Sequence, residues 1–207
     1  MKKKGYLVTF EGLEGSGKST QVSLLAGRIK ERDRKIKVTR EPGGTRIGEL
    51  IRRITHDREN VDLTAIAESY LMAASRAQHV REIIRPALEA GLIVLCDRYL
   101  DSSLAYQGFG RELGEENIFQ LNKLAIDGLL PDLTVFLDIN ISAGIKRRNS
   151  TVKIDRLDLQ QEDFYKRVYR GYKKLSEKYS SRYFVVDGAK SIEEVAEKIW
   201  ERVGELI

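Results

Sequence analysis

The feature that most constrains the fold of this chain is a glycine-rich segment near its N-terminus. Residues 12–19 fit the pattern G-x-x-x-x-G-K-[ST], which is typical of a phosphate-binding loop. The segment follows an apolar run at residues 6–10 and precedes a helical pattern at residues 21–30. Glycines let successive backbone N–H groups turn toward one anion at the start of a helix, where partial positive charge gathers. The segment therefore predicts a strand, a phosphate-binding loop and a helix, with Lys18 at the terminal phosphates and the Ser19 hydroxyl on Mg²⁺.

Apolar runs alternate with helical patterns along the rest of the chain. Further strand-like runs lie at residues 36–39, 92–96, 133–137 and 183–186. Helical patterns cover residues 65–81, 142–148 and 161–179, and a terminal helix begins at the capping-box pair Ser191 and Glu194. Strands that alternate with helices favour a parallel sheet covered on both faces. We predict one α/β domain over residues 1–207, of the three-layer P-loop class, with a five-stranded parallel sheet and a small mobile lid at about residues 145–158.

Local signals assign two further segments. The helical pattern of residues 65–81 continues to Ala90, and Pro86 within it predicts a helix start or a kink. Residues 100–111 are predicted to form a loop, after which helices run to about Gly128.

Charged and polar residues follow each of the predicted strands. Ligands of open parallel sheets lie beyond the carboxyl ends of the strands. That edge collects the phosphate loop, residues 40–45, residues 97–99, Asp138 and residues 187–189. A phosphate cradle with several arginines and acidic groups supplies the positioning, charge neutralisation and metal binding that phosphoryl transfer needs. Of these groups, we expect Asp138 to anchor the following helix.

Composition narrows the partners of the chain. The net charge of +5 is compatible with nucleic acid, but the basic residues spread over several helices and are not interleaved with aromatic residues. We therefore expect phosphorylated small molecules as ligands, and no nucleic acid. No apolar run is long enough to span a membrane, so we expect a cytoplasmic protein. Cys96 lies in an apolar run and is expected to be a buried, inert thiol, while His56 and His79 are too separated to form a metal site.

Together the motifs resemble those of the bacterial thymidylate kinases, which transfer the γ-phosphate of ATP to dTMP. The resemblance runs from about Gly5 to the C-terminus and rests on residues 10–20, 40–45, 75–76, 97–99 and 102–108. The phosphate loop alone indicates only a superfamily. The Arg-Glu-Pro-Gly-Gly-Thr and Ala-Tyr-Gln-Gly segments, each after its own strand, are far more specific.

The resemblance implies a MgATP site around the loop. ATP would contact Gly12, Leu13, Glu14, Gly15, Ser16, Gly17, Lys18, Ser19 and Thr20, with Ala189 near adenine. Ser19 would bind Mg²⁺, and Asp97 would steer the metal or its waters together with the acceptor.

The resemblance also implies a dTMP site. Glu14 would accept the 3′-hydroxyl, Arg40 and Arg98 would hold the phosphate, and Tyr106 would crowd the position of a 2′-hydroxyl. Arg76 and Gln107 would bond the thymine edge. The full set expected at dTMP is Glu14, Arg40, Pro42, Met72, Arg76, Arg98, Ser102, Tyr106 and Gln107.

Two departures from the family pattern matter. Met72 stands where the family commonly has Phe, so a thioether replaces a ring beside the base. Gly15 stands where some members carry a catalytic Arg, and relatives without that Arg supply a cation from the lid. The candidates are Arg147, Arg148, Lys153 and Arg156, and the sequence does not choose among them.

The expected reaction is direct in-line transfer from MgATP to dTMP, which supplies dTTP synthesis for DNA replication. Lys18, Asp97, Arg98 and the lid cations are the catalytic candidates. The alternatives are a kinase for another nucleoside monophosphate and a P-loop ATPase that acts as a switch. The family usually forms a homodimer, and the apolar face of residues 65–81 is a candidate interface, although it also fits an ordinary core.

Overall fold

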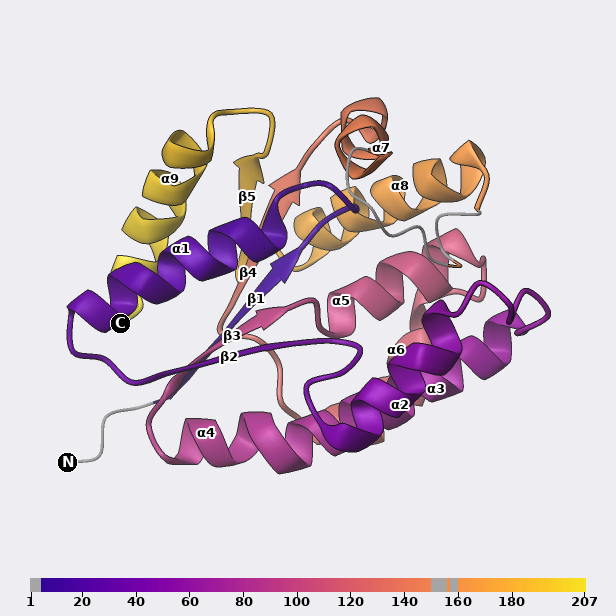
Figure 1. Ribbon diagram of the computed structural model, residues 1–207, viewed down its shortest axis with the longest axis horizontal. Helices are drawn as coiled ribbons and strands as arrows, with labels where there is room; N and C mark the ends of the chain where they lie inside the picture. Colours follow the sequence, from indigo (N-terminus) through magenta and orange to yellow (C-terminus); the bar gives the residue numbers. More distant parts are fainter. Residues whose placement is uncertain (1–4, 150–155, 157–159) are drawn as a thin grey trace.

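The structure is a computed structural model that describes residues 5–149, 156 and 160–207 (Figure 1). Its sheet contains five parallel strands in the order β2-β3-β1-β4-β5. They are β1 (Tyr6–Glu11), β2 (Ile36–Arg40), β3 (Ile93–Asp97), β4 (Leu133–Asp138) and β5 (Tyr183–Asp187). The predicted three-layer fold is therefore confirmed.

Two helices cover one face of the sheet. They are α1 (Lys18–Glu31), which follows the phosphate loop, and α9 (Ile192–Gly204) (Figure 1). Alternate strand residues such as Val8 and Phe10 pack against them in one apolar cluster. The predicted capping box opens α9, since the Ser191 hydroxyl accepts the backbone N–H of Glu194 and the Glu194 side chain returns the contact.

The opposite face carries a larger layer of helices. Leu7, Val94, Cys96 and Phe136 point into this layer from the strands. It includes α3 (Ala65–His79), the π-helical turns η1 (Val80–Ile84), α4 (Arg85–Glu89), α6 (Glu115–Ile126) and α8 (Glu162–Lys178). The predicted helix through Pro86 is thus nearly continuous. The wider π turns open the hydrogen-bond ladder just before the proline, which cannot complete it.

Two helical segments differ from the sequence predictions. The helix α2 (Arg46–His56) was not predicted, although Thr45 caps it by accepting the N–H of Gly48. The predicted loop at residues 100–111 is wrong, because α5 (Leu100–Ser103) and the π-helical η2 (Leu104–Gly110) occupy it. The glycines of this segment allow close packing of its helical turns. A Cβ on Gly110 would lie 2.7 Å from both Phe164 and Val168 of α8.

The carboxyl ends of the strands are tied to one another and so define one edge. Arg98 donates its backbone N–H to the Phe10 carbonyl at 2.9 Å, and Glu41 donates to the Asp97 carbonyl at 3.0 Å. On the other side of β1, Gly188 donates to the Asp138 carbonyl at 2.7 Å. The helix α7 (Ile141–Asn149) follows β4 at this edge. Among the described residues, no helix combines the length and apolarity that crossing a membrane requires.

Candidate active site

The phosphate loop has the conformation that its glycines predict. Gly12, Gly15 and Gly17 have φ values of 140°, 75° and 95°, which side-chain-bearing residues rarely adopt. A Cβ on Gly12 would also lie 2.7 Å from the Leu137 carbonyl oxygen. The loop therefore wraps tightly before α1, with its N–H groups beside the helix N-terminus.

Lys18 lies buried within this loop. Its Nζ donates to the carbonyl oxygens of Leu13 at 2.8 Å and Gly12 at 3.2 Å. Burial and, after it, the nearby Arg98 cation lower the pKa of Lys18 to about 8, although nearby carboxylates that include Asp97 oppose the shift. Because its charge is poorly solvated here, the Lys18 ammonium group would be stabilised by binding a phosphate group.

Ser19 and Asp97 form the candidate Mg²⁺ site. The Ser19 hydroxyl donates to the Asp97 carboxylate at 2.5 Å, which joins the start of α1 to the end of β3. The described residues contain no group of three or more His, Cys, Asp or Glu arranged for a metal ion. One carboxylate and one hydroxyl nevertheless fit Mg²⁺, which takes oxygen ligands and usually completes its shell with phosphates and water.

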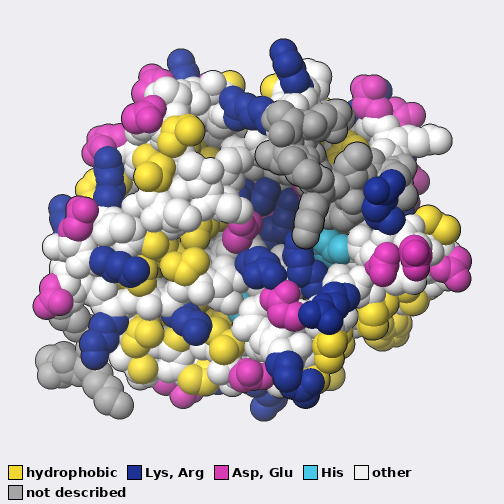
Figure 2. Space-filling view, in the orientation of Figure 1, with side chains coloured by type: hydrophobic (Ala, Val, Ile, Leu, Met, Phe, Trp, Pro, Cys, Tyr) yellow, Lys and Arg dark blue, Asp and Glu magenta, His cyan; other side chains and the backbone are white. Residues whose placement is uncertain are grey.

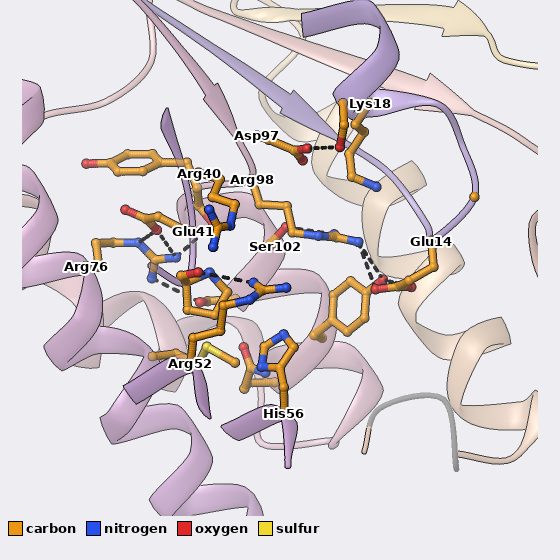
Figure 3. A pocket seen from close by; sticks show the side chains of 18 residues that line it. Glu14, Lys18, Arg40, Glu41, Arg52, His56, Arg76, Asp97, Arg98 and Ser102 are labelled. Carbon is orange, nitrogen blue, oxygen red and sulfur yellow. Dashed lines mark hydrogen bonds and ion pairs between the residues drawn. The ribbon is translucent and has the colours of Figure 1, made fainter. Parts of the chain in front are cut away.

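Arg98 and Glu14 form a partly buried pair on the next wall (Figure 3). Arg98 Nη2 lies 2.8 Å from Glu14 Oε1, and the Tyr106 hydroxyl donates to the other oxygen. Burial alone would raise the pKa of Glu14, but Arg98 and Lys18 hold it below its usual value. Asp97 and Arg98 are adjacent, yet each bonds a different partner.

The far end of the cavity is organised around Arg76, which is only 3 % exposed. Its Nε and Nη2 face Glu41 Oε2, each at 2.8 Å. Its remaining donors reach the Tyr99 carbonyl, the Ser103 hydroxyl and the Asn122 side chain. Every guanidinium nitrogen is thus bonded to the protein, so Arg76 fixes this wall rigidly.

His79, on the helix of Arg76, completes the wall. Its Nδ1 lies 2.8 Å from Glu41 Oε1 and its Nε2 lies 2.6 Å from the Thr39 hydroxyl.

A second buried carboxylate, Glu68, holds Gln107. Gln107 Nε2 donates to Glu68 Oε1 at 2.8 Å, and Arg111 forms an ion pair with the same carboxylate at 3.0 Å. Arg156 also pairs with Glu68 and donates to the Thr55 carbonyl at 3.0 Å. Arg156, which belongs to the predicted lid, is therefore bound to the same carboxylate as Gln107.

One cavity brings together the residues predicted to contact dTMP (Figure 3). Its lining includes Glu14, Arg40, Pro42, Met72, Arg76, Arg98, Ser102, Tyr106 and Gln107, together with Lys18, Ser19 and Asp97. Basic side chains gather in the hollow on this face of the molecule (Figure 2). Arg40 is its most exposed arginine among the predicted set, and it pairs with Glu49 at 2.8 Å.

The cavity also contains residues that the sequence analysis missed. Arg52 and His56 line it from α2, and Arg52 donates to the Pro42 carbonyl at 3.1 Å. Glu41, Tyr99 and Ser103 complete the wall around Arg76. The Thr45 cap and the spacing of Arg52 and His56, four residues apart, were the available signals for a helix that aims both side chains at one place.

A second cavity adjoins the outer side of the phosphate loop. It is lined by Gly15, Ser16, Gly17, Lys18, Ser19 and Thr20, with Arg147, Gly188 and Lys190 opposite. Gly12 and Leu13 line neither cavity, since their carbonyls hold Lys18. Ala189 is not in the lining, although both of its neighbours are, and its N–H donates to Asp187 at 2.9 Å.

Of the other predicted lid cations, Arg147 donates to the Gly188 carbonyl at 2.9 Å, beside this second cavity. Lys153 and the side chain of Arg148 lie outside the part of the chain that the structure describes.

Two predictions about single residues have different outcomes. Cys96 is buried as expected, and burial raises the pKa of its thiol well above the usual value. Asp138 does not primarily hold the following helix. Its carboxylate pairs with Lys173 of α8 at 3.1 Å, while the Asn140 side chain accepts the N–H of Ser142 at the start of α7.

The sheet order, the loop after β1 and the adjoining arginine-rich cavity define a P-loop kinase for a small phosphorylated acceptor. Comparisons with known proteins agree. The thymidylate kinase family model matches residues 10–199. The chain is 46% identical to the thymidylate kinase of Geobacillus thermodenitrificans, over 92% of this chain and 86% of that protein. It is 45% identical to that of Desulforudis audaxviator, over 98% of this chain and 92% of that protein.

A solved structure gives the same result. The crystal structure of thymidylate kinase from Ehrlichia chaffeensis superposes with a TM-score of 0.79 at 32% identity, covering 97% of this chain and 99% of that one. The chain belongs to the thymidylate kinase family, a group of nucleoside monophosphate kinases.

Proposed function

We propose that this chain phosphorylates dTMP to dTDP with the γ-phosphate of MgATP, in the supply of dTTP for DNA replication. The observation that carries the proposal is that Gly15, Lys18 and Ser19 line both cavities. A donor phosphate on the loop and an acceptor phosphate in the arginine-rich cavity would therefore meet at the same side chains. Such shared placement supplies most of what phosphoryl transfer asks of a protein.

The acceptor cavity has an end for each part of dTMP. Arg98 and the more exposed Arg40 supply positive charge for the phosphate near the loop. Glu14, already bonded to Tyr106, is placed to accept the 3′-hydroxyl, and the Tyr106 ring limits the room for a 2′-hydroxyl. The base would lie at the end formed by Met72, Arg76 and Gln107. Met72 is buried and offers an apolar, polarisable surface in place of a ring.

The transfer itself would be direct and in line. The acceptor phosphate is anionic at neutral pH, so no strong general base is required. Lys18 would neutralise charge on the transferring group, and Ser19 and Asp97 would hold Mg²⁺, which neutralises the β- and γ-phosphate oxygens when bound. That residues 145–158 close as a lid, and that one of their cations acts like an arginine finger, stay predictions.

A panel of acceptors tests the proposal. ADP formation is followed in a coupled assay with dTMP, dUMP, dCMP and ribothymidine monophosphate. Arg76 is fully bonded to the protein, so base choice falls to the other buried polar groups at this end, such as the Gln107 amide. Cytosine would leave these groups badly paired, so we expect kcat/KM for dCMP about 10⁴-fold below that for dTMP. The missing methyl group of dUMP should cost only about 1–3 kcal/mol. Equal turnover of dCMP and dTMP contradicts the base assignment, and preference for AMP or CMP contradicts the proposed substrate.

We also propose that the chain forms a cytoplasmic homodimer. Ile66 and Tyr70 on α3 are 57% and 63% exposed, and Leu124 on the neighbouring α6 is 89% exposed. Apolar side chains of this size, gathered on two helices that pack together, are suited to burial against a second copy. Light scattering that gives a mass twice that of the chain would support this assignment, and the mass of a single chain would refute it.

A further inference from the structure

Glu11 is a buried carboxylate that lies behind Arg98 and has no role in the mechanism proposed above. It ends β1, just before the phosphate loop, and its side chain is fully buried. Oε1 accepts the backbone N–H of Tyr99 at 2.8 Å. Oε2 accepts the hydroxyl of Ser102 at 2.5 Å and that of Tyr172 at 3.0 Å. A buried carboxylate costs free energy to ionise, so this arrangement calls for a function.

The same two hydroxyls contact Arg98. Arg98 Nη1 donates to Ser102 Oγ at 3.1 Å, to Tyr172 Oη at 3.2 Å and to the Gly12 carbonyl at 3.0 Å. Figure 3 shows Ser102 beside Arg98 in the cavity wall. Glu11 and Arg98 are therefore joined through a layer of two hydroxyl groups.

The direction of these hydrogen bonds depends on the charge of Glu11. Each hydroxyl has one hydrogen, and its oxygen accepts from Arg98 only if that hydrogen points elsewhere. An ionised Glu11 is an acceptor alone, so it draws both hydrogens and leaves the oxygen lone pairs facing the cation. The two hydroxyl oxygens also lie 2.9 Å from each other, so one hydrogen can be shared between them. A donor at Oε2 would leave the other hydroxyl hydrogen no acceptor at Glu11 and would turn it toward Arg98, which it repels.

We propose that Glu11 is a positioning residue for the acceptor phosphate: its ionised carboxylate orients the Ser102 and Tyr172 hydroxyls, and these hold the Arg98 guanidinium at the phosphate position. The inference rests on the proposed function, because it takes Arg98 as the group that holds the dTMP phosphate. Glu11 itself touches no substrate. Its bond to the Tyr99 N–H adds a second constraint, since it holds the backbone next to Arg98, which has the left-handed φ of 69°.

The surroundings of Glu11 make this arrangement sensitive to pH. Burial and, after it, the neighbouring Asp101 carboxylate raise the pKa of Glu11 to about 7, although the Ser102 hydroxyl and Arg98 oppose the rise. Asp101 in turn pairs with Arg182 at 2.7 Å. Other described titratable groups that interact with Glu11 include Lys18, Cys96, Tyr172, Arg182 and Tyr183. Below about neutral pH the carboxylate gains a proton, and Arg98 loses its orienting partners.

The variant Glu11→Gln keeps the contact of one carboxylate oxygen and changes that of the other. Its amide oxygen still accepts the Tyr99 N–H, while its NH₂ group places a donor opposite both hydroxyls. Titration calorimetry at pH 8 should show dTMP binding weakened at least tenfold, as expected for one charge-assisted network. Thymidine, which lacks the phosphate, should bind the variant as it binds the unaltered chain. Glu115→Gln is the matched control, because Glu115 accepts from the Tyr179 hydroxyl and Lys178 outside the cavity.

The outcomes are distinguishable. Unchanged binding of dTMP to folded Glu11→Gln, or equal loss of dTMP and thymidine, overturns the positioning role. An unaltered chain that binds thymidine as tightly as dTMP overturns the proposed acceptor-phosphate site and this inference with it.

The pH profile provides a second test, which also serves if Glu11→Gln does not fold. kcat/KM for dTMP should fall below about pH 7 in the unaltered chain by more than the titration of dTMP explains, and Glu11→Gln should lack this added fall. Asp101→Asn removes the like charge and should move the fall to lower pH. A profile that Asp101→Asn leaves in place contradicts the inference.

Discussion

The two cavities differ in the groups that they offer to phosphates. We call the cavity beside the phosphate loop the donor end and the arginine-rich cavity the acceptor end. At the donor end, the loop of backbone amides around Lys18 is built from one continuous segment of the chain, and Arg147, Gly188 and Lys190 lie opposite it. The acceptor end is a set of charged and polar side chains that bond one another. They come from β1, β2, α3, α5 and η2 and from the segment just after β3. Glu11 and Tyr172, which support the same arginine, are separated by 161 residues in the sequence. The phosphate loop is therefore a local structure, and the acceptor end exists only in the folded chain.

This difference in construction has an energetic consequence. At the donor end, the buried charge of Lys18 is costly in the absence of phosphate, so it serves binding at the expense of stability. At the acceptor end, Arg76, Glu41 and His79 satisfy one another in the folded chain. Substitutions should therefore separate activity from stability at the donor end and reduce both in the buried Arg76, Glu41 and His79 cluster of the acceptor end.

The largest expected effect comes from Lys18→Met, which keeps the apolar stem and removes the charge. Loss of a preorganised cation at the transferring phosphate should lower kcat by about 10³-fold or more. The folded-state pKa of Lys18 lies below its unfolded value, so unfolding takes up a proton between about pH 8 and the usual lysine range.

The stability of the unaltered chain should therefore rise through that interval, and Lys18→Met should lack this rise. At pH 7 the desolvated charge costs roughly 3 kcal/mol by this linkage, so the variant should melt at the same or a higher temperature. A strongly destabilised Lys18→Met would contradict the proposed difference between the ends.

Arg76→Ala should have the opposite character. Removing the arginine leaves the Glu41 carboxylate buried beside His79, and breaking a buried pair in this way costs about 3–5 kcal/mol. We expect urea unfolding to show that loss together with a loss of dTMP turnover. Arg40→Ala is the control, since Arg40 and Glu49 are 49% and 39% exposed and such pairs contribute about 1 kcal/mol or less. Equal effects of the two substitutions on unfolding would remove the distinction between the two arginines.

The sequence predicted most of the fold and the phosphate loop because both depend on local patterns along the chain. Alternating apolar runs indicated five strands, and the loop pattern alone located Lys18 and Ser19. Resemblance to a family supplied the acceptor residues, and the structure brings all of them to one cavity. Local signals in the sequence did not reveal α2 or the helical path of residues 100–110. Gly110 is a weak helix former by itself, and only the folded chain shows that it allows close packing against α8.

The partners of each acceptor residue were beyond prediction from local sequence. Arg76 and Gln107 were expected only at the base, yet Arg76 bonds Glu41 and Gln107 bonds Glu68, across 35 and 39 residues. Such pairings are set by how α3 and η2 pack over the sheet, and no spacing rule along the chain encodes them. Glu11 shows the same limit, since its position in the motif suggested no role until Ser102 and Tyr172 lay beside it.

In the proposed reaction the two cavities serve one transfer, that of the γ-phosphate from ATP on the loop to dTMP in the acceptor cavity. The most direct test measures ADP, dTDP and inorganic phosphate from MgATP with and without dTMP. We expect ADP to appear only with dTMP and in equal amount with dTDP. ADP and inorganic phosphate formed at the same rate without dTMP would show a hydrolase that uses the loop alone, and would contradict the proposed reaction.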